Sequence, residues 1–202
     1  MIAAALSLAL SMSLSAGGAG AGEHLLAGAG LFREARYAEA LVEFRVAQRL
    51  GAAEAAGYAG ATLVQLGRPD EALEAFGGPD APARDALLDY YRGLAAFDAR
   101  LYLAADRALT SLGSRAGPRI AGQAARLRQE IATALSGEPP RTAVDWYLAR
   151  CAEYRGQQRE VLARAFCRES SELGARRADR YGAQPRSASE PASQAKLAGS
   201  RP

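Results

Sequence analysis

Residues 28–47 read GAGLFREARYAEALVEFRVA, and residues 60–76 read GATLVQLGRPDEALEAF. Both segments follow the pattern Gly-x2-Leu, then an aromatic residue or proline, then Ala-Leu-x2-Phe, and the second copy is shifted by 32 residues from the first. Within each copy the large apolar residues recur three or four positions apart, which is the spacing of one face of an α-helix. A repeat of this length predicts helical pairs that stack side by side along the chain.

Small residues and turn residues stand where such a pair of helices needs them. Gly28 allows two helices to approach closely, and Leu31 and Phe44 fill the seam between them. In the second copy, Gly67 suits the position just after a helix, and Pro69 suits the first turn of the next helix. The sequence therefore predicts a helix, a short turn and a second, antiparallel helix in each copy.

This combination of residues resembles the tetratricopeptide repeat, whose unit is a pair of antiparallel helices of about 34 residues. The resemblance implies an all-α fold: a right-handed superhelix of antiparallel helix pairs, or α-solenoid, with a helical C-terminal cap. The alternative is a plain all-α bundle in which the spacing of the two copies is coincidental. The chain has no run of alternating β-branched residues that would predict a strand.

The repeat pattern weakens along the chain. We expect three repeats, at about 23–52, 53–84 and 85–117. The third is degenerate, because Asp106 stands where the first two copies have leucine. Residues 118–173 are predicted to form C-terminal helices, with a poorer fourth match from about Thr142 to Glu172.

The N-terminus predicts export. Residues 2–16 are apolar with interspersed serines, and residues 19–21 fit a small-residue cleavage site, so residues 1–21 are predicted to be a signal peptide. Neither Lys nor Arg precedes the apolar stretch, and this departure leaves open an uncleaved segment that anchors the protein in the inner membrane. We expect a periplasmic or secreted bacterial protein, with membrane contact only through residues 2–16 if they are retained.

Basic residues are concentrated towards the C-terminal end. Residues 1–140 carry 13 Arg against 15 acidic residues, whereas residues 141–202 carry 12 basic against 7 acidic residues. Arg176, Arg177 and Arg180 have no aromatic platform beside them, so nucleic acid is not expected as a partner. Residues 182–202 contain almost no large apolar side chain, and we expect this tail to be disordered.

The chain has two cysteines, Cys151 and Cys167. If the turn of the C-terminal hairpin centres near Gln158, the two oppose one another and can form a disulfide, as exported proteins commonly do. If the turn centres on Gly156, they miss each other and remain two buried small apolar residues. Between Thr142 and Gly156, Trp146 is interpreted as a packing residue, with a ligand-facing role as the alternative.

The resemblance also implies a binding surface, because the first helix of each tetratricopeptide pair lines a concave groove. Its positions correspond here to residues that we expect to be free to contact a partner: Leu25, Ala29, Phe32, Arg33, Gly57, Ala61, Val64, Gln65, Tyr90, Leu94, Phe97 and Asp98. Such a groove is apolar with isolated polar points, which suits a helix or an extended peptide. For Phe32 and Phe97 the alternative is contact with the adjoining helix.

The sequence offers little material for catalysis. His24 is the only histidine, no recognisable set of zinc ligands is present, and the Gly-rich segment 17–22 lacks the Gly-Lys-Ser/Thr ending of a phosphate loop. The chain has no Asn and a single Lys, Lys196 in the tail, so it lacks the Lys and Asn pairs with which tetratricopeptide co-chaperones grip a C-terminal carboxylate.

These observations predict a protein without enzymatic activity, cofactor or metal. We expect an adaptor or assembly factor of the bacterial envelope that binds another protein or a peptide. A self-associating structural component, and so a homo-oligomer, is the first alternative. An enzyme with an unrecognised site is a less favoured one.

Overall fold

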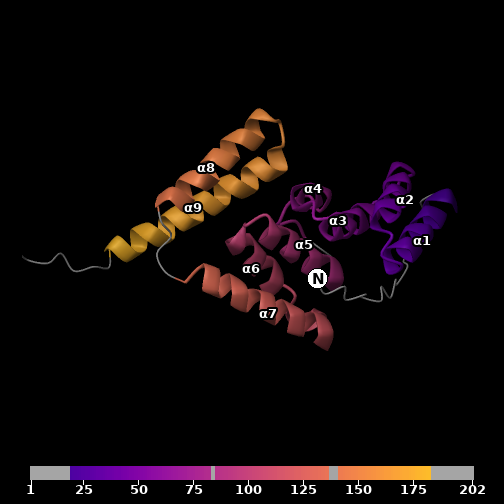
Figure 1. The fold of residues 1–202 in the computed structure, drawn as a ribbon, viewed down its shortest axis with the longest axis horizontal. Coiled ribbons are helices and arrows are strands. Elements are labelled where there is room, and N and C mark those ends of the chain that lie inside the picture. The colour runs from indigo at the N-terminus through magenta and orange to yellow at the C-terminus, as the bar shows by residue number, and fades with distance from the viewer. Residues whose placement is uncertain (1–18, 83–84, 137–140, 183–202) are drawn as a thin grey trace, which may run out of the picture.

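The computed structural model describes residues 19–82, 85–136 and 141–182, and within these ranges the protein is α-helical without strands (Figure 1). This confirms the predicted all-α class. The first six helices form three antiparallel hairpins: α1 (Ala19–Arg33) with α2 (Tyr37–Arg49), α3 (Ala55–Gln65) with α4 (Pro69–Ala75), and α5 (Ala86–Asp98) with α6 (Tyr102–Thr110). A 3-10 turn (Gly113–Arg115) then leads to α7 (Pro118–Ala134), and α8 (Arg141–Gly156) and α9 (Glu160–Gly182) form a fourth hairpin.

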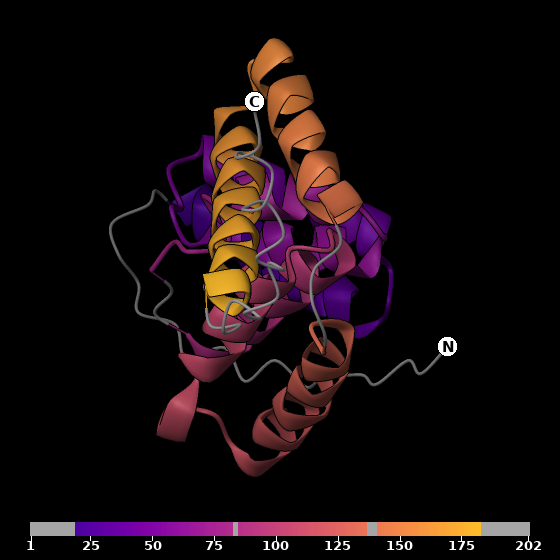
Figure 2. The same cartoon turned by 90° about the vertical axis from the view of Figure 1, so that its left-hand side faces the viewer.

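The hairpins are arranged as a row with two flanking elements. The row runs from α1 and α2 at one end to α5 and α6, and α7 packs on α5 and α6 (Figure 1). The fourth hairpin does not extend the row. It folds back so that α9 packs against α4 and α6, the second helices of the second and third hairpins, and in Figure 2 it lies in front of the row, with α7 below it.

All four hairpins turn in the same way. The second residue after the first helix adopts a positive φ in each: Ala35 (59°), Gly67 (69°), Arg100 (65°) and Gln158 (59°). The following residue donates its N–H to the carbonyl five positions back, as from Arg36 to Leu31 at 2.9 Å. The turn residue donates its own N–H to the carbonyl three positions back, as from Ala35 to Phe32 at 3.1 Å. The two bonds together satisfy carbonyls at the helix end and reverse the chain within three residues.

The seam between paired helices also recurs. In each of the first three hairpins a glycine of the first helix faces a large side chain of the second: Gly28 faces Phe44, Gly60 faces Phe76, and Gly93 faces Leu109. A Cβ added to the glycine would lie 2.8 Å, 2.9 Å and 2.7 Å, respectively, from that side chain. Glycine is required at these positions because any side chain would collide with the opposite helix.

The fourth hairpin carries cysteines at the equivalent seam positions. Gly28 and Phe44 are 16 residues apart, and so are Cys151 and Cys167, each pair lying seven residues before and nine after its turn residue. The structure joins Cys151 and Cys167 in a disulfide with their Cα atoms 5.1 Å apart. This pairing follows from a turn at Gln158, which is one of the two alternatives that the sequence left open.

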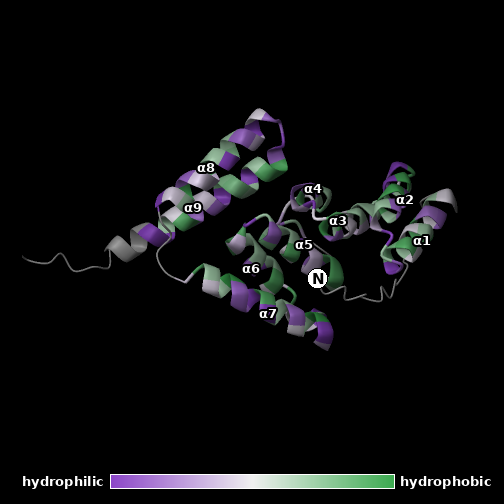
Figure 3. Ribbon diagram, viewed as in Figure 1, coloured by the Kyte–Doolittle hydropathy of each residue, from purple (hydrophilic) through white to green (hydrophobic). Residues whose placement is uncertain are grey.

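A buried alanine marks the same place in every second helix, five residues after the turn. Its exposed fraction is 1% or less in all four hairpins: Ala40, Ala72, Ala105 and Ala163. The small side chain lets the second helix approach the first, while larger apolar residues fill the space on either side. Hydrophobic and hydrophilic residues alternate along α7, α8 and α9 (Figure 3), and the buried residues of α7 and of α8 recur three or four positions apart, so each of these two helices buries one face.

The ends of the chain bear on the predicted export segment and tail. Residues 19–21, the predicted cleavage site, form the first turn of α1, and Ala21 is buried in the core. Residues 1–18 and 183–202, with most of the predicted signal peptide and almost all of the predicted tail, lie outside the described residues. Among the helices that the structure describes, none is long and apolar enough to cross a bilayer.

Candidate binding site

The predicted groove over the first two repeats is filled by the protein's own core. Five of the residues expected to be free to contact a partner are 8% exposed or less: Leu25, Ala29, Phe32, Ala61 and Val64. The expectation that they are accessible is therefore wrong. Gly57 is half-buried. The side chain of Leu88 from the next hairpin packs closely over it, and a Cβ added at Gly57 would lie 2.7 Å from that side chain.

The groove is closed because α1 and α5 meet across α3. The ring of Phe32 in α1 lies edge-on to Tyr91 of α5, with centroids 6.1 Å apart. The side-chain amide of Gln65 in α3 donates a hydrogen bond to the Tyr91 hydroxyl at 3.3 Å. Burial raises the pKa of Tyr91 to about 12. For Phe32, the alternative of packing against neighbouring helices is the one that the structure shows.

The remaining groove residues are more accessible. Arg33 is exposed and donates to the carbonyl of Ala29 at 3.3 Å, one turn back in its own helix. Tyr90, Leu94 and Phe97 of α5 are half-buried against the core. Asp98, the last residue of α5, is exposed. The accessible part of the predicted surface is thus confined to the third hairpin and to Arg33 and Gln65.

A cleft of about 250 Å³ adjoins Asp98 on the side of the fourth hairpin. It lies where the turns of the second and third hairpins meet α8 and α9, and it is lined by Pro69, Asp70, Asp98, Ala99, Arg100, Trp146, Arg150 and Phe166. Of these residues, only Asp98 belonged to the predicted binding surface. The others come together through the folding back of α8 and α9, which the repeat pattern does not encode.

Aromatic side chains of α8 and α9 form one wall of the cleft. Trp146 is 39% exposed and lies edge-on to Tyr147 and Phe166, with centroids 4.8 Å and 6.0 Å away. Tyr147 is buried, and its hydroxyl donates to the carbonyl oxygen of Arg100 at 2.5 Å, so it ties α8 to the turn of the third hairpin. Packing therefore accounts for Tyr147, whereas Trp146 keeps part of its indole in the cleft.

Two of the four charged residues in the cleft are engaged with each other. The guanidinium of Arg150 lies 3.7 Å from the carboxylate of Asp70. The Tyr154 hydroxyl accepts a hydrogen bond from Arg150 and donates one to Asp70. Arg150 also pairs with Glu153 at 2.6 Å. The contacts of Arg150 and Tyr154 with Asp70 hold the C-terminal half of α8 against the first turn of α4.

The other two charged residues, Asp98 and Arg100, have no counterion among the described residues. Asp98 makes no ion pair or side-chain hydrogen bond there, and loss of hydration raises the pKa of its carboxyl. Arg100 makes no ion pair with another described residue, and its guanidinium lies over the Trp146 ring, 6.0 Å from the centroid. Within the part of the chain that the structure describes, the cleft therefore presents one carboxylate and one guanidinium without an ion-pair partner, and part of an indole.

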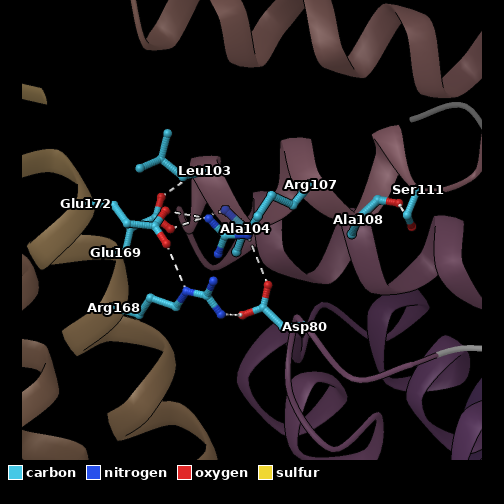
Figure 4. A network of polar contacts seen from close by, with 9 residues as sticks. All are labelled: Asp80, Leu103, Ala104, Arg107, Ala108, Ser111, Arg168, Glu169 and Glu172. Carbon is cyan, nitrogen blue, oxygen red and sulfur yellow. Dashed lines mark hydrogen bonds and ion pairs between the residues drawn. The ribbon is translucent and has the colours of Figure 1, made fainter.

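The fourth hairpin is held against the row by a buried carboxylate. Glu169 of α9 is fully buried and accepts hydrogen bonds from the backbone N–H groups of Leu103 at 2.6 Å and Ala104 at 3.2 Å, in the first turn of α6 (Figure 4). A carboxylate in this position caps the helix and complements its dipole. Desolvation nevertheless raises the pKa of Glu169 to about 7.

A ring of alternating charges lies beside this cap. Arg107 bonds Asp80 at 3.0 Å and Glu172 at 2.5 Å, and Arg168 bonds Asp80 at 3.2 Å and Glu172 at 2.8 Å (Figure 4). The ring joins three parts of the chain: helix α6, helix α9 and the loop that follows α4. Because the fourth hairpin is fixed in this way, the cleft between it and the row has defined walls.

Comparison with known proteins finds no matching family model, no matching curated protein and no matching solved structure. What can be said of function therefore comes from the residues of this chain and their arrangement.

Proposed function

We propose that this chain is a non-catalytic protein-interaction module built from tetratricopeptide-like hairpins. The observation that supports this proposal is the recurrence of one hairpin design. Each hairpin has a left-handed turn residue, a seam at which two residues 16 positions apart in the sequence meet, and a buried alanine at a fixed position. Arrays of repeated helical pairs typically present surfaces to other proteins. In this proposal the first three hairpins are a short right-handed superhelix, and α7 with the fourth hairpin is its cap.

The proposed contact surface is the cleft, and not the concave groove. Phe32 and Tyr91 close the groove over α3, whereas in the cleft Asp98 and Arg100 have no ion-pair partner among the described residues and Trp146 is partly exposed. Binding surfaces are commonly enriched in Trp and Arg, and free charges at such a surface select partners of complementary charge.

We place the protein in an oxidising compartment, the bacterial periplasm or the extracellular space. Two features support this placement: the apolar N-terminal segment and the disulfide between Cys151 and Cys167. Disulfides persist in exported proteins and are rare in reducing cytosol.

Self-association is the second candidate function. The concave groove, with which tetratricopeptide repeats usually bind another protein, is filled here by the chain's own side chains, and this favours self-association over binding of a different protein. Three large apolar residues of the first hairpin are also about half exposed: Leu26, Val42 and Leu50.

Photo-crosslinking in the native cell tests these candidates. A photoreactive residue is placed in turn at Trp146 in the cleft, at the exposed Asp145 beside it, and at Val42, exposed on the first hairpin. The proposal predicts adducts with one recurring protein, and a defined complex when that protein and this chain are purified and mixed. Adducts with this chain alone, together with a dimer mass in solution, would establish self-association instead. Absence of adducts at all three positions would contradict both.

A further inference from the structure

We propose, building on the protein-binding function above, that the cleft takes a peptide segment in which a basic and an acidic side chain are neighbours. The basic side chain pairs with Asp98, the acidic one pairs with Arg100, and the aliphatic part of the segment lies on Trp146. This assignment rests on one carboxylate and one guanidinium that lie beside a partly exposed indole and have no ion-pair partner in the ranges that the structure describes.

The carboxylate of Asp98 favours a cation for two reasons. It is the last residue of α5, where the helix dipole is negative and an acidic side chain is disfavoured. The surrounding protein also removes part of its water, which raises the pKa of the carboxyl, and no described residue supplies a positive partner. A basic side chain from a partner compensates both effects.

The guanidinium of Arg100 favours an anion, and its backbone is held in place. Its residue forms the left-handed turn between α5 and α6, and its carbonyl accepts the hydrogen bond from buried Tyr147. Arg150, the other guanidinium in the cleft, is already committed to Asp70, Glu153 and Tyr154. Arg100 is therefore the group in the cleft that can bind a carboxylate of the partner, through a forked pair of hydrogen bonds.

The walls of the cleft are preorganised for such a segment. Trp146 is fixed by edge-on contacts with Tyr147 and Phe166, and the fourth hairpin is fixed by the disulfide and by Glu169. A peptide that binds there orders few side chains of this protein, so less binding free energy is lost.

The position of Trp146 provides a direct measurement, because it is the only tryptophan in the chain. Its intrinsic fluorescence reports cleft occupancy without a label. The probes are acetylated and amidated tetrapeptides: Ala-Arg-Glu-Ala, Ala-Arg-Gln-Ala, Ala-Gln-Glu-Ala and Ala-Gln-Gln-Ala. We expect a saturable fluorescence change with Ala-Arg-Glu-Ala, weaker binding of each singly charged peptide, and weakest binding of the neutral one. Binding of Ala-Arg-Glu-Ala should also weaken as salt is added.

Two variants assign the two charges, and two others control for net charge. Asp98→Asn should weaken binding of Ala-Arg-Gln-Ala about three- to tenfold and leave Ala-Gln-Glu-Ala unaffected, while Arg100→Gln should do the reverse. The controls are Glu23→Gln in α1 and Arg126→Gln in α7, two exposed side chains whose replacement changes the net charge by the same amounts. Both should bind like the wild type, and circular dichroism verifies that each variant is folded.

The assignment is overturned if all four peptides bind alike, if none gives a saturable change, or if neither cleft variant shifts the preference. The crosslinked partner separates this failure from failure of the proposed function. A partner that still binds the double variant Asp98→Asn/Arg100→Gln with wild-type affinity would contradict the cleft assignment and leave the interaction function standing.

Discussion

In the first hairpin Gly28 lies beneath the ring of Phe44, whereas in the fourth hairpin Cys151 and Cys167 occupy the same two positions and are bonded. The turn between the helices is the same in both, and so is the buried alanine after it. The two hairpins differ in their surroundings. The first buries residues along both helices and adjoins α3, whereas α8 buries only Tyr147, Cys151 and Tyr154.

This difference shows how one hairpin design is stabilised in two environments. Where neighbouring helices bury the seam, an aromatic ring over glycine is sufficient. Where one helix remains largely exposed, the apolar area removed from water is small, and a covalent link offsets the deficit by restricting the unfolded chain. The experiments below separate these two modes, from the largest expected effect to the smallest.

Removing the ring from the first seam should have the largest effect. Phe44 is 1% exposed, and Phe44→Ala should lower the free energy of unfolding by about 3–5 kcal/mol, because it leaves a cavity over Gly28. Val42→Ala, in the same helix but 58% exposed, should cost less than about 0.5 kcal/mol. Chemical denaturation measures both. Similar losses for the two variants would contradict the burial of this seam.

Removing the covalent link of the fourth hairpin should cost somewhat less. For Cys151→Ala/Cys167→Ala we expect a loss of about 3 kcal/mol, the value for a closed loop of this length. Hydrogen exchange should show the loss first in α8 and α9, with α1 to α4 still protected. Uniform loss of protection along the chain would mean that the fourth hairpin is not a separate unit.

The buried carboxylate that docks α9 predicts a pH dependence. Its folded pKa, about 7, lies above the usual 4.5, so the folded protein binds this proton more tightly than the unfolded chain does. Stability from this group is therefore complete below about pH 4.5 and is lost as the pH rises through 7, by up to about 3 kcal/mol.

The variant Glu169→Gln should remove this slope, since the amide does not titrate. Denaturant unfolding at pH 5 and pH 8 measures how the free energy of unfolding changes with pH. Glu160→Gln, at an exposed position in the first turn of α9, is the control and should keep the pH dependence of the wild type. A wild-type protein equally stable at both pH values would contradict the buried state of Glu169.

The shared turn predicts the smallest effect. Ala35 and Gln158 adopt left-handed φ values that favour glycine, so Ala35→Gly and Gln158→Gly should each stabilise the protein by up to about 1 kcal/mol. Gly67→Ala, at the equivalent turn of the second hairpin, should destabilise it by a similar amount. Thermal unfolding measures these shifts. The same sign for all three changes would show that the turns are not equivalent.

Local signals in the sequence predicted the hairpins, and long-range packing explains what they missed. In the second hairpin, Gly60, Gly67 and Pro69 mark a seam, a helix end and a helix start within ten residues. The contact between Phe32 and Tyr91 instead depends on how tightly successive hairpins curve, which spacing within one repeat does not determine. The sequence therefore predicted an open groove where the structure has a closed one.

The candidate cleft could be predicted only in part. Asp98 was identified from its register, but its neighbours Trp146 and Arg150 reach it through a hairpin that folds back along the row. The cap that holds this hairpin joins Glu169 to Leu103, 66 residues earlier, and no local pattern indicates such a contact. The spacing of the two cysteines, equal to that of Gly28 and Phe44, was a usable signal for the register of the fourth hairpin.

The equivalence of the four hairpins is tested most directly by moving the disulfide. In a Cys151→Ala/Cys167→Ala background, Gly60→Cys and Phe76→Cys are introduced together at the seam of the second hairpin. If the seams are equivalent, the two new thiols disappear on mild oxidation, by thiol titration and mass spectrometry, and the oxidised protein is more stable than its reduced form. Two thiols that persist under conditions that oxidise the wild-type pair would contradict the account.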